Sequence, residues 1–108
     1  MKIKRSKYNA VKSNGYDSKK ESEIAQILEL REKAGEIQHL QKQVKFELIP
    51  SQYRNKKCIE RAMNYIADFT YVENGETVVA DVKGWRTKEY RIKRKLMLFI
   101  HDIIIKEL

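Results

Sequence analysis

The stretch YIADFTYVENGETVVADVKG, residues 65–84, is typical of two β-strands joined by a two-residue turn. Its centre is Asn74-Gly75. Asn-Gly is the strongest short-range signal for a β-hairpin, because a type I′ turn needs a positive φ at both central residues. With these two residues at the turn, Glu73 pairs with Glu76 and the pairing continues outward. The turn therefore predicts which residues face one another across the two strands.

This register places three charged residues on one face of the hairpin. Asp68 faces Asp81, and Lys83, two residues further along, faces Ile66. Two carboxylate charges about 5 Å apart repel by roughly 3 kcal/mol at an effective dielectric of 20. A divalent cation would offset that repulsion, since Mg²⁺ is typically bound by one or two carboxylates together with substrate phosphates. The pattern therefore predicts a metal site at the open end of the hairpin.

The alternative is a solvated strand end in which Lys83 forms an ion pair with Asp68. The apolar surroundings of both acids, NYIADF and VVADVKGW, argue against it. If the two acids form a metal site, repulsion predicts that removing Asp81 leaves the metal-free protein at least as stable as before.

A third acid is expected from an N-terminal helix. Glu21 precedes Ile24, Ala25 and Leu28 by three, four and seven residues, so it shares the helix face that packs on the sheet. The alternative is a capping box, in which Glu21 bonds the backbone of an N-cap Ser18. Glu23, on a neighbouring flank of the helix, is a second alternative for the acid.

The other elements follow from hydrophobic periodicity and turn residues. We expect a turn before the first helix and a polar loop between the first two strands. The resulting order is αβββαβ, which indicates a mixed sheet flanked by helices, of class α/β (α+β). The predicted ranges are turn 13–18, helix 19–33, strand 44–50, loop 51–57, strands 59–72 and 77–83, helix 87–100 and strand 102–108.

Positive charge is concentrated in two segments of this 108-residue chain, whose net charge is +8. Residues 1–20 hold seven basic residues and one acid, and residues 83–95 hold the same balance. The remainder of the chain is net negative. Two separate basic clusters indicate a polyanionic partner, whereas a single cluster is as often a solvated surface.

Several classes of protein are disfavoured by the composition. Cys58 is the only cysteine, so no internal disulfide can form, as is usual in a reducing compartment. The apolar runs are too short to span a membrane, and no apolar segment follows the N-terminal charges as it would in a signal peptide. We therefore expect a cytoplasmic protein without a membrane partner.

An acid on a helix, then Asp, then Asp-x-Lys on a hairpin is the motif order of the PD-(D/E)XK nuclease superfamily. Glu21, Asp68, Asp81 and Lys83 are the matching residues, with Ala67 in place of the motif's Pro. The chain resembles this superfamily and, further, a family of small phage and prophage proteins. The segments that carry the resemblance are KYNAVK, YDSKKESE, LQKQVKFEL, YIADFTY, VVADVKGW and KEYRIKRKL.

The resemblance implies a basic arm, residues 1–16, followed by a restriction-endonuclease-like domain, residues 17–108. It implies that Asp68, Asp81 and the Val82 carbonyl hold Mg²⁺ or Mn²⁺, and that Glu21 holds a second ion or a bridging water. Lys83 would orient or deprotonate the attacking water. Gln43, on a neighbouring strand, is an auxiliary candidate.

The implied activity is metal-dependent endonucleolytic cleavage of DNA in phage recombination, replication or repair, inside a bacterial host. No dedicated sequence-reading motif is present, which favours a structure-selective enzyme. The alternative is a non-catalytic DNA-binding protein on a degenerate nuclease fold. Such nucleases often pair their active sites, so a homodimer is among the expected assemblies. Phosphate contacts are expected from Lys19, Lys20, Lys88, Arg91, Lys93, Arg94 and Lys95.

Overall fold

The structure, a computed structural model, describes residues 12–82 and 86–108. Lys83 and residues 1–11 of the expected basic arm therefore lie outside the described residues. The elements are α1 Lys12–Lys33, β1 Gln38–Ile49, β2 Gln52–Arg54, β3 Lys57–Glu60, β4 Met63–Glu73, β5 Glu76–Asp81, α2 Lys88–His101 and β6 Lys106–Glu107.

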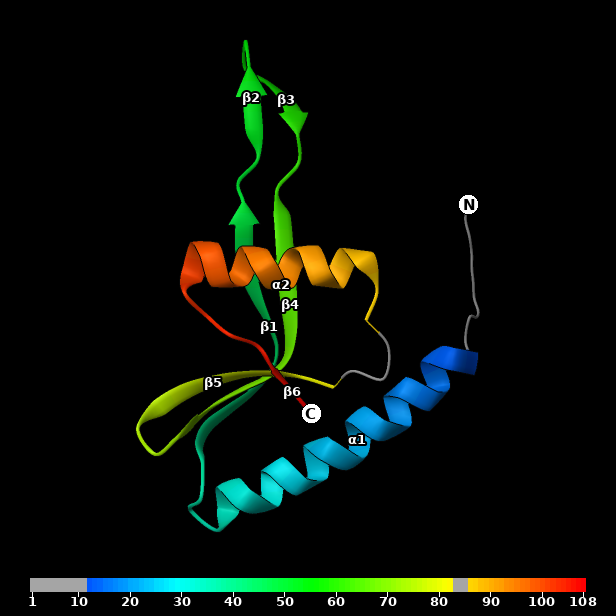
Figure 1. Cartoon of the computed structure of the whole chain (residues 1–108), viewed down its shortest axis with the longest axis vertical. Coiled ribbons are helices and arrows are strands. Elements are labelled where there is room, and N and C mark those ends of the chain that lie inside the picture. Colours follow the sequence, from blue (N-terminus) through cyan, green and yellow to red (C-terminus); the bar gives the residue numbers. More distant parts are fainter. Residues whose placement is uncertain (1–11, 83–85) are drawn as a thin grey trace.

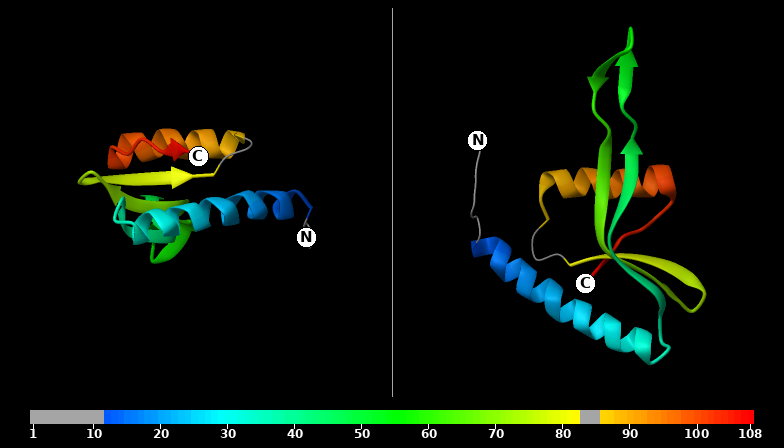
Figure 2. Two further views of the ribbon diagram at one scale, coloured as in Figure 1. Left: turned by 90° about the horizontal axis from the view of Figure 1, so that it is seen from below. Right: turned by 180° about the vertical axis from the view of Figure 1, so that it is seen from behind.

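Four strands form one mixed sheet in the order β1-β4-β5-β6. The β1–β4 and β4–β5 pairs are antiparallel, whereas β5 and β6 are parallel. Parallel strands need a crossover connection, and α2 lies in it. The two helices lie on opposite sides of the sheet (Figures 1 and 2). The predicted class, a mixed sheet flanked by helices, is confirmed.

The β4–β5 hairpin has the predicted register. Asn74 and Gly75 occupy the turn with φ values of 53° and 79°, as a type I′ turn requires. The ladder ends one residue short of the two aspartates. Its pairs are Glu73–Glu76, Val72–Thr77, Tyr71–Val78, Thr70–Val79 and Phe69–Ala80.

Four local predictions are wrong. The strand expected at 59–72 is divided into β3 and β4, and the strand expected at 102–108 is only Lys106–Glu107. The expected polar loop at residues 51–57 is instead part of a second hairpin, β2–β3, whose turn residues Asn55 and Lys56 have φ values of 54° and 65°. The first helix begins at Lys12 rather than at residue 19, so the expected turn at 13–18 is helical. Ser18 therefore lies inside the helix, which excludes the capping box as the role of Glu21.

The long β1–β4 ribbon packs against α2 with one half and against α1 with the other. Tyr65 and Ala67 belong to a core with α2, whereas Phe69 and Tyr71 belong to a core with Leu28 of α1. Alternate residues of a regular strand share one face, so the ribbon must change orientation between Ala67 and Phe69. The residue at the change is Asp68.

The partner strand changes orientation at the same level. Within the regular part of β1, Phe46 packs against the α2 core, whereas Lys42, also an even-numbered residue, forms an ion pair with Glu29 of α1. Gln43 lies between them with a φ of 54°, a left-handed conformation that costs a non-glycine residue about 1–2 kcal/mol. The ribbon is bent in Figure 1. Gln43, across from Asp68, has a strained backbone, and such strain tends to occur at functional sites.

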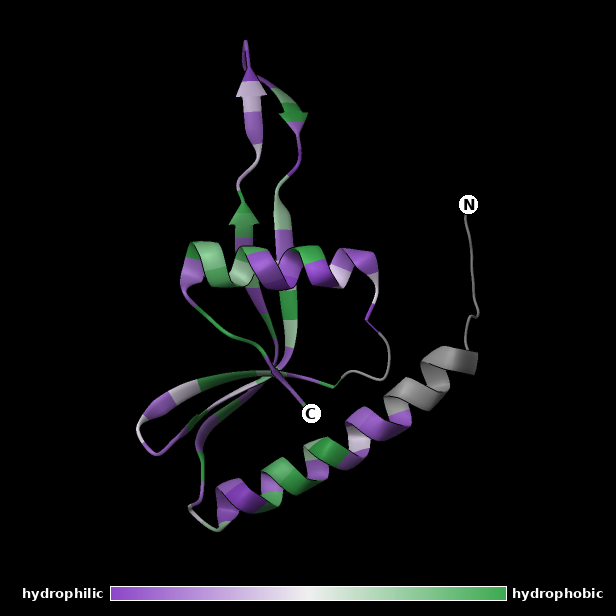
Figure 3. Ribbon diagram, in the orientation of Figure 1, coloured by the Kyte–Doolittle hydropathy of each residue, from purple (hydrophilic) through white to green (hydrophobic). Residues whose placement is uncertain are grey.

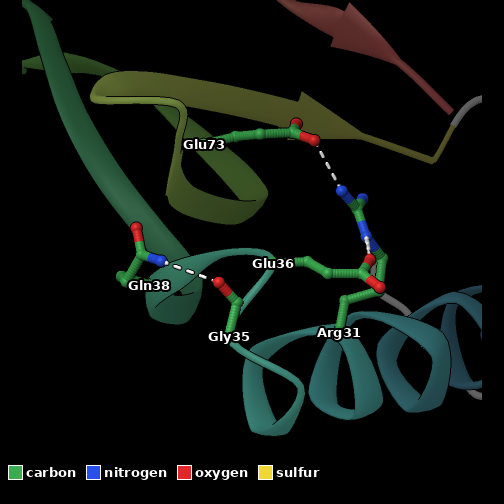
Figure 4. Close-up of polar contacts among 5 residues, drawn as sticks. All are labelled: Arg31, Gly35, Glu36, Gln38 and Glu73. Atoms are coloured by element: carbon green, nitrogen blue, oxygen red, sulfur yellow. Dashed lines mark hydrogen bonds and ion pairs between the residues drawn. The ribbon is translucent and has the colours of Figure 1, made fainter.

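The C-terminal end of α1 is fixed to the β4–β5 hairpin by a charged contact. Arg31 donates one hydrogen bond to Glu73 at 2.5 Å and another to Glu36 at 3.0 Å (Figure 4). Leu28, 3% exposed, packs under the same helix against the sheet. This attachment sets the angle at which α1 crosses the sheet, and Glu21 lies further towards its N-terminus.

Candidate active site

The two aspartates of the hairpin are joined by reciprocal backbone contacts. The Asp68 amide donates to Asp81 Oδ1 at 2.8 Å, and the Val82 amide donates to Asp68 Oδ2 at 3.0 Å. The predicted juxtaposition of Asp68 and Asp81 is confirmed, and Val82 lies beside them as expected. Each carboxylate accepts a hydrogen bond from the strand that carries the other, so the pair closes the open end of the ladder.

Asp81 is the more deeply buried of the two, with 1% of its surface exposed. Its second oxygen, Oδ2, accepts a hydrogen bond from the hydroxyl of Tyr65. Burial and the adjacent Asp81 carboxylate raise the pKa of Tyr65 above its usual range, so this hydroxyl stays protonated and donates. The backbone carbonyl of Asp81 accepts from the Leu108 amide at 2.8 Å, which ties β6 to the site.

The third acid approaches through a glutamine. Gln43 Nε2 donates to Glu21 Oε2 at 3.0 Å and to Asp68 Oδ1 at 3.4 Å. The neighbouring pairs Lys42–Phe69 and Val44–Ala67 place Gln43 directly across from Asp68. The expectations that Glu21 and Gln43 lie near the aspartates are therefore confirmed. The strained backbone of Gln43 is what turns its amide between two carboxylates.

The charge of this group is only partly compensated within the described residues. Burial raises the pKa of Asp68 to about 6, and the nearby carboxylates of Asp81 and Glu21 add to the shift. The hydrogen bond from the Val82 amide acts in the opposite direction. A carboxyl with a raised pKa beside two other acids is typical of a functional site, although structural networks also produce such shifts.

We expect the metal-free protein to lose stability relative to Asp68→Asn as the pH rises from about 4 to about 6. The pKa of Asp68 is about 3.9 in an unfolded chain and about 6 in the folded one, so folding takes up a proton in this window. The contribution of Asp68 to stability is therefore greatest below pH 4 and falls by about 1–2 kcal/mol through pH 6, after allowance for the exposure of this half-buried group.

Urea unfolding at pH 4 to 7 in EDTA measures this effect. The control is Asp68→Asn, which keeps an oxygen to accept from the Val82 amide but does not titrate. Its stability should exceed that of the wild type near pH 7 and match it near pH 4. Identical pH profiles for the two proteins would contradict the proposed environment of Asp68.

A pocket of about 270 Å³ opens beside the two aspartates, between β4 and the first turns of α2. Among the described residues, β5 pairs with β4 only from Phe69 onward. The pocket is bounded by β4 on one side and by the first turns of α2 on the other. Its lining residues are Asn64, Tyr65, Ile66, Asp68, Asp81, Thr87, Glu89, Tyr90 and Lys93.

The sequence pattern of one protein family, described as Protein of unknown function (DUF1064), matches residues 5–103. The chain belongs to the DUF1064 family. The match includes Glu21, Gln43, Asp68 and Asp81, so the whole acidic group lies within the family region. No curated protein and no solved structure matches the chain. Among the residues described, no helix is long and apolar enough to cross a membrane.

The residues of this DUF1064 protein that are expected to bind phosphate differ in whether an acidic side chain lies next to them. Lys93 is paired with Glu89 at 3.0 Å, and Arg94 lies 3.5 Å from Glu107 and over the ring of Tyr90. Tyr90 is buried and packs in the α2 core. No ion pair is seen within the described ranges for the exposed Lys19, Lys88, Arg91 and Lys95 or the half-buried Lys20.

The donor set of the DUF1064 site suits a hard cation. Within the part of the chain that is described, no three His, Cys, Asp or Glu side chains are close enough to hold a metal alone. Asp68 and Asp81 nevertheless line one pocket with oxygen donors, and each carboxylate has about four lone-pair sites. Because Mg²⁺ is commonly held by two carboxylates, water and substrate phosphate, the residues present fit such an ion.

Tyr65 is the member of the site that the sequence did not indicate. It lies in an alternating apolar strand, where a tyrosine is usually a core residue. Its ring does pack in the α2 core, and only the hydroxyl reaches Asp81. A buried tyrosine usually needs a hydrogen-bond partner for its hydroxyl. That requirement is the one signal in the sequence that could have indicated a polar group near Tyr65.

Proposed function

We propose that this protein is a metal-dependent DNA endonuclease that hydrolyses phosphodiester bonds and selects its substrates by DNA structure. The observation that carries the proposal is the group of Glu21, Asp68 and Asp81. Gln43 links Glu21 to Asp68, and the Asp68 amide donates to Asp81. The resemblance to PD-(D/E)XK nucleases supports the same reading. The proposed setting is phage recombination, replication or repair.

Each residue of the site has a distinct part in this proposal. Asp68, half-buried and facing the pocket, and Asp81 would hold the ion, with the Val82 carbonyl as a further ligand. A divalent cation there would polarise the scissile phosphate and make bound water more acidic. Gln43 positions the carboxylates of Asp68 and Glu21 relative to each other. Lys83 would orient the attacking water or take its proton.

The cationic surface supports a nucleic-acid substrate. Lys88, Arg91 and Lys95 are exposed on α2, whose first turns border the pocket. Cations at these positions would contact phosphates next to the bond that is cut, without reading its sequence. Such contacts make binding strongly dependent on salt, which is a property that binding assays measure directly.

The second candidate is a non-catalytic DNA-binding protein. The observation that favours it is the deep burial of Asp81, whose two oxygens already accept hydrogen bonds from Tyr65 and from the Asp68 amide. A carboxylate so occupied could serve structure alone. Under this reading the basic surface would bind DNA and no bond would be cleaved.

A cleavage panel separates the two candidates. Labelled linear, nicked, flapped and four-way DNA would be incubated with the protein in Mg²⁺, in Mn²⁺ and in EDTA. The proposal predicts cleavage of at least one branched or nicked substrate with either metal and none in EDTA. Salt-sensitive binding to all four substrates without cleavage under any condition would favour the second candidate.

A further inference from the structure

The β2–β3 hairpin projects from the fold. Every residue from Gln52 to Glu60 is exposed, and the hairpin forms one end of the molecule's longest axis, beyond α2 (Figure 1). Its turn and the adjoining β2 are hydrophilic in Figure 3. At its base the Ala62 amide donates to Ser51 Oγ at 3.1 Å, which joins the two arms where they enter the sheet. Nothing in the core explains an extension of this kind.

The tip of the hairpin is cationic. Arg54 pairs across the strands with Lys57, and Lys56 occupies the turn. No ion pair involves these three residues in the part of the chain that the structure describes, although six ion pairs are seen elsewhere in it. Two like charges directly opposite each other destabilise a strand pair. An anionic partner would remove that cost.

The length of the chain between the hairpin and the acidic site limits how far apart they can lie. Lys57 precedes Asp68 by eleven residues along β3 and β4. At about 3.3 Å per residue these strands place the tip at most about 36 Å from Asp68. One helical turn of B-DNA, 10–10.5 base pairs, is about 34–36 Å. The two features are therefore separated by at most about one turn of a duplex.

We propose that the β2–β3 hairpin binds the phosphate backbone of double-stranded DNA about one helical turn from the acidic site. The part of this proposal that relates the contact to a cleavage position rests on the proposed function. The contact between the hairpin and DNA does not require cleavage. A duplex is favoured over a single strand because DNA is stiff over about 150 base pairs, so two contacts one turn apart reinforce each other only on a duplex.

The first test compares duplex lengths by fluorescence anisotropy in EDTA, so that cleavage is irrelevant. A 30-base-pair duplex spans both features, and a DNA hairpin with a stem of about 6 base pairs, roughly 20 Å long, does not. Arg54→Gln/Lys57→Gln should weaken binding to the long duplex about tenfold and reduce its salt slope by about two ions. Binding to the short duplex should change less than about twofold.

The matched control is Lys33→Gln/Lys106→Gln, which removes the same charge from the end of α1 and from β6. Both of these lysines are exposed. We expect the control to bind the long duplex at least fivefold more tightly than the hairpin variant does. Equal weakening in the two variants would overturn the proposal, because it would mean that only net charge matters.

The second test uses the only cysteine of the chain, Cys58, which lies exposed in β3. A photo-activated crosslinker attached to Cys58 should react with the long duplex. Cys58→Ser/Ile66→Cys carries the same reagent at the pocket, where Ile66 is 52% exposed. On a nicked substrate, the two crosslinks should map about 8–12 base pairs apart. Crosslinks at the same position, or none from Cys58, would overturn the proposal.

Failure of this proposal and failure of the proposed nuclease function give different results. If the protein shows the length effect and the crosslink spacing but cleaves no substrate, the hairpin contact is supported and the nuclease function is rejected. If the Arg54→Gln/Lys57→Gln variant cuts DNA at the wild-type rate, the proposed nuclease function is retained and the proposed hairpin contact is rejected. Tighter binding of a matched RNA duplex, or a shift from dimer to monomer in the hairpin variant, would assign the hairpin to another partner and overturn the proposal.

Discussion

Asp68→Asn is expected to lower DNA cleavage about 10³-fold or more while leaving the protein folded. The substitution removes a negative charge from the half-buried carboxylate that faces the pocket, together with its capacity to hold a divalent ion. The hydrogen bond from the Val82 amide can be retained by the remaining amide oxygen. Single-turnover cleavage in Mg²⁺, with anisotropy in EDTA to measure DNA affinity, separates the loss of chemistry from the loss of binding.

Glu21→Gln is the informative comparison. The amide of glutamine still reaches Gln43 but carries no charge, and Glu21 contacts Asp68 only through that side chain. Its effect on cleavage should be smaller, about tenfold to a hundredfold, as is usual for residues that position a metal ligand. Cleavage by Asp68→Asn at the wild-type rate would show that Asp68 is not a ligand and would leave the site as a structural cluster.

The hairpin at the centre of the fold was predictable because its information is local. Asn74-Gly75 sets the turn, the turn sets the register, and the period of two places Asp68 opposite Asp81 without reference to the rest of the chain. The position of Glu21 followed from helical spacing in the same way. In both cases residues that are close together in the sequence determine the geometry.

The bend of the β1–β4 ribbon could not be predicted in this way. A positive φ at Gln43 is unfavourable for the isolated strand, so only the packing of the two ribbon halves against different helices can maintain it. The second hairpin was missed because its turn is Asn55-Lys56, in which lysine replaces the expected glycine. The early start of α1 was missed because Gly15 and Asn14 are poor helix formers, and propensity is a weak prior.

Asp81→Ala is expected to destabilise the metal-free protein by about 2–4 kcal/mol, lowering its melting temperature by 10 °C or more. The sequence alone predicts the opposite, because only the repulsion from Asp68 is visible in it. In the structure Asp81 accepts hydrogen bonds from the Tyr65 hydroxyl and the Asp68 amide. Alanine would leave both donors without this acceptor in a buried place. The free energy lost in this way exceeds the free energy gained by removing the repulsion from Asp68.

Thermal melts in EDTA measure the effect, and two tyrosine variants control it. Tyr65→Phe should cost about 1.5–3 kcal/mol, because a hydroxyl that donates to a buried carboxylate is lost. Tyr71→Phe should cost less than about 0.5 kcal/mol, because no hydrogen bond of the Tyr71 hydroxyl is seen among the described residues, although this side chain is just as buried.

The double variant Tyr65→Phe/Asp81→Ala decides whether the contact itself is responsible. If Tyr65 and Asp81 stabilise the fold through their shared hydrogen bond, the double variant should be more stable than the sum of the single losses predicts, by about 1–2 kcal/mol. Additive losses would mean that each residue acts through packing alone. A melting temperature of Asp81→Ala equal to or above that of the wild type would contradict the structural role. It would leave metal binding as the only proposed role of Asp81.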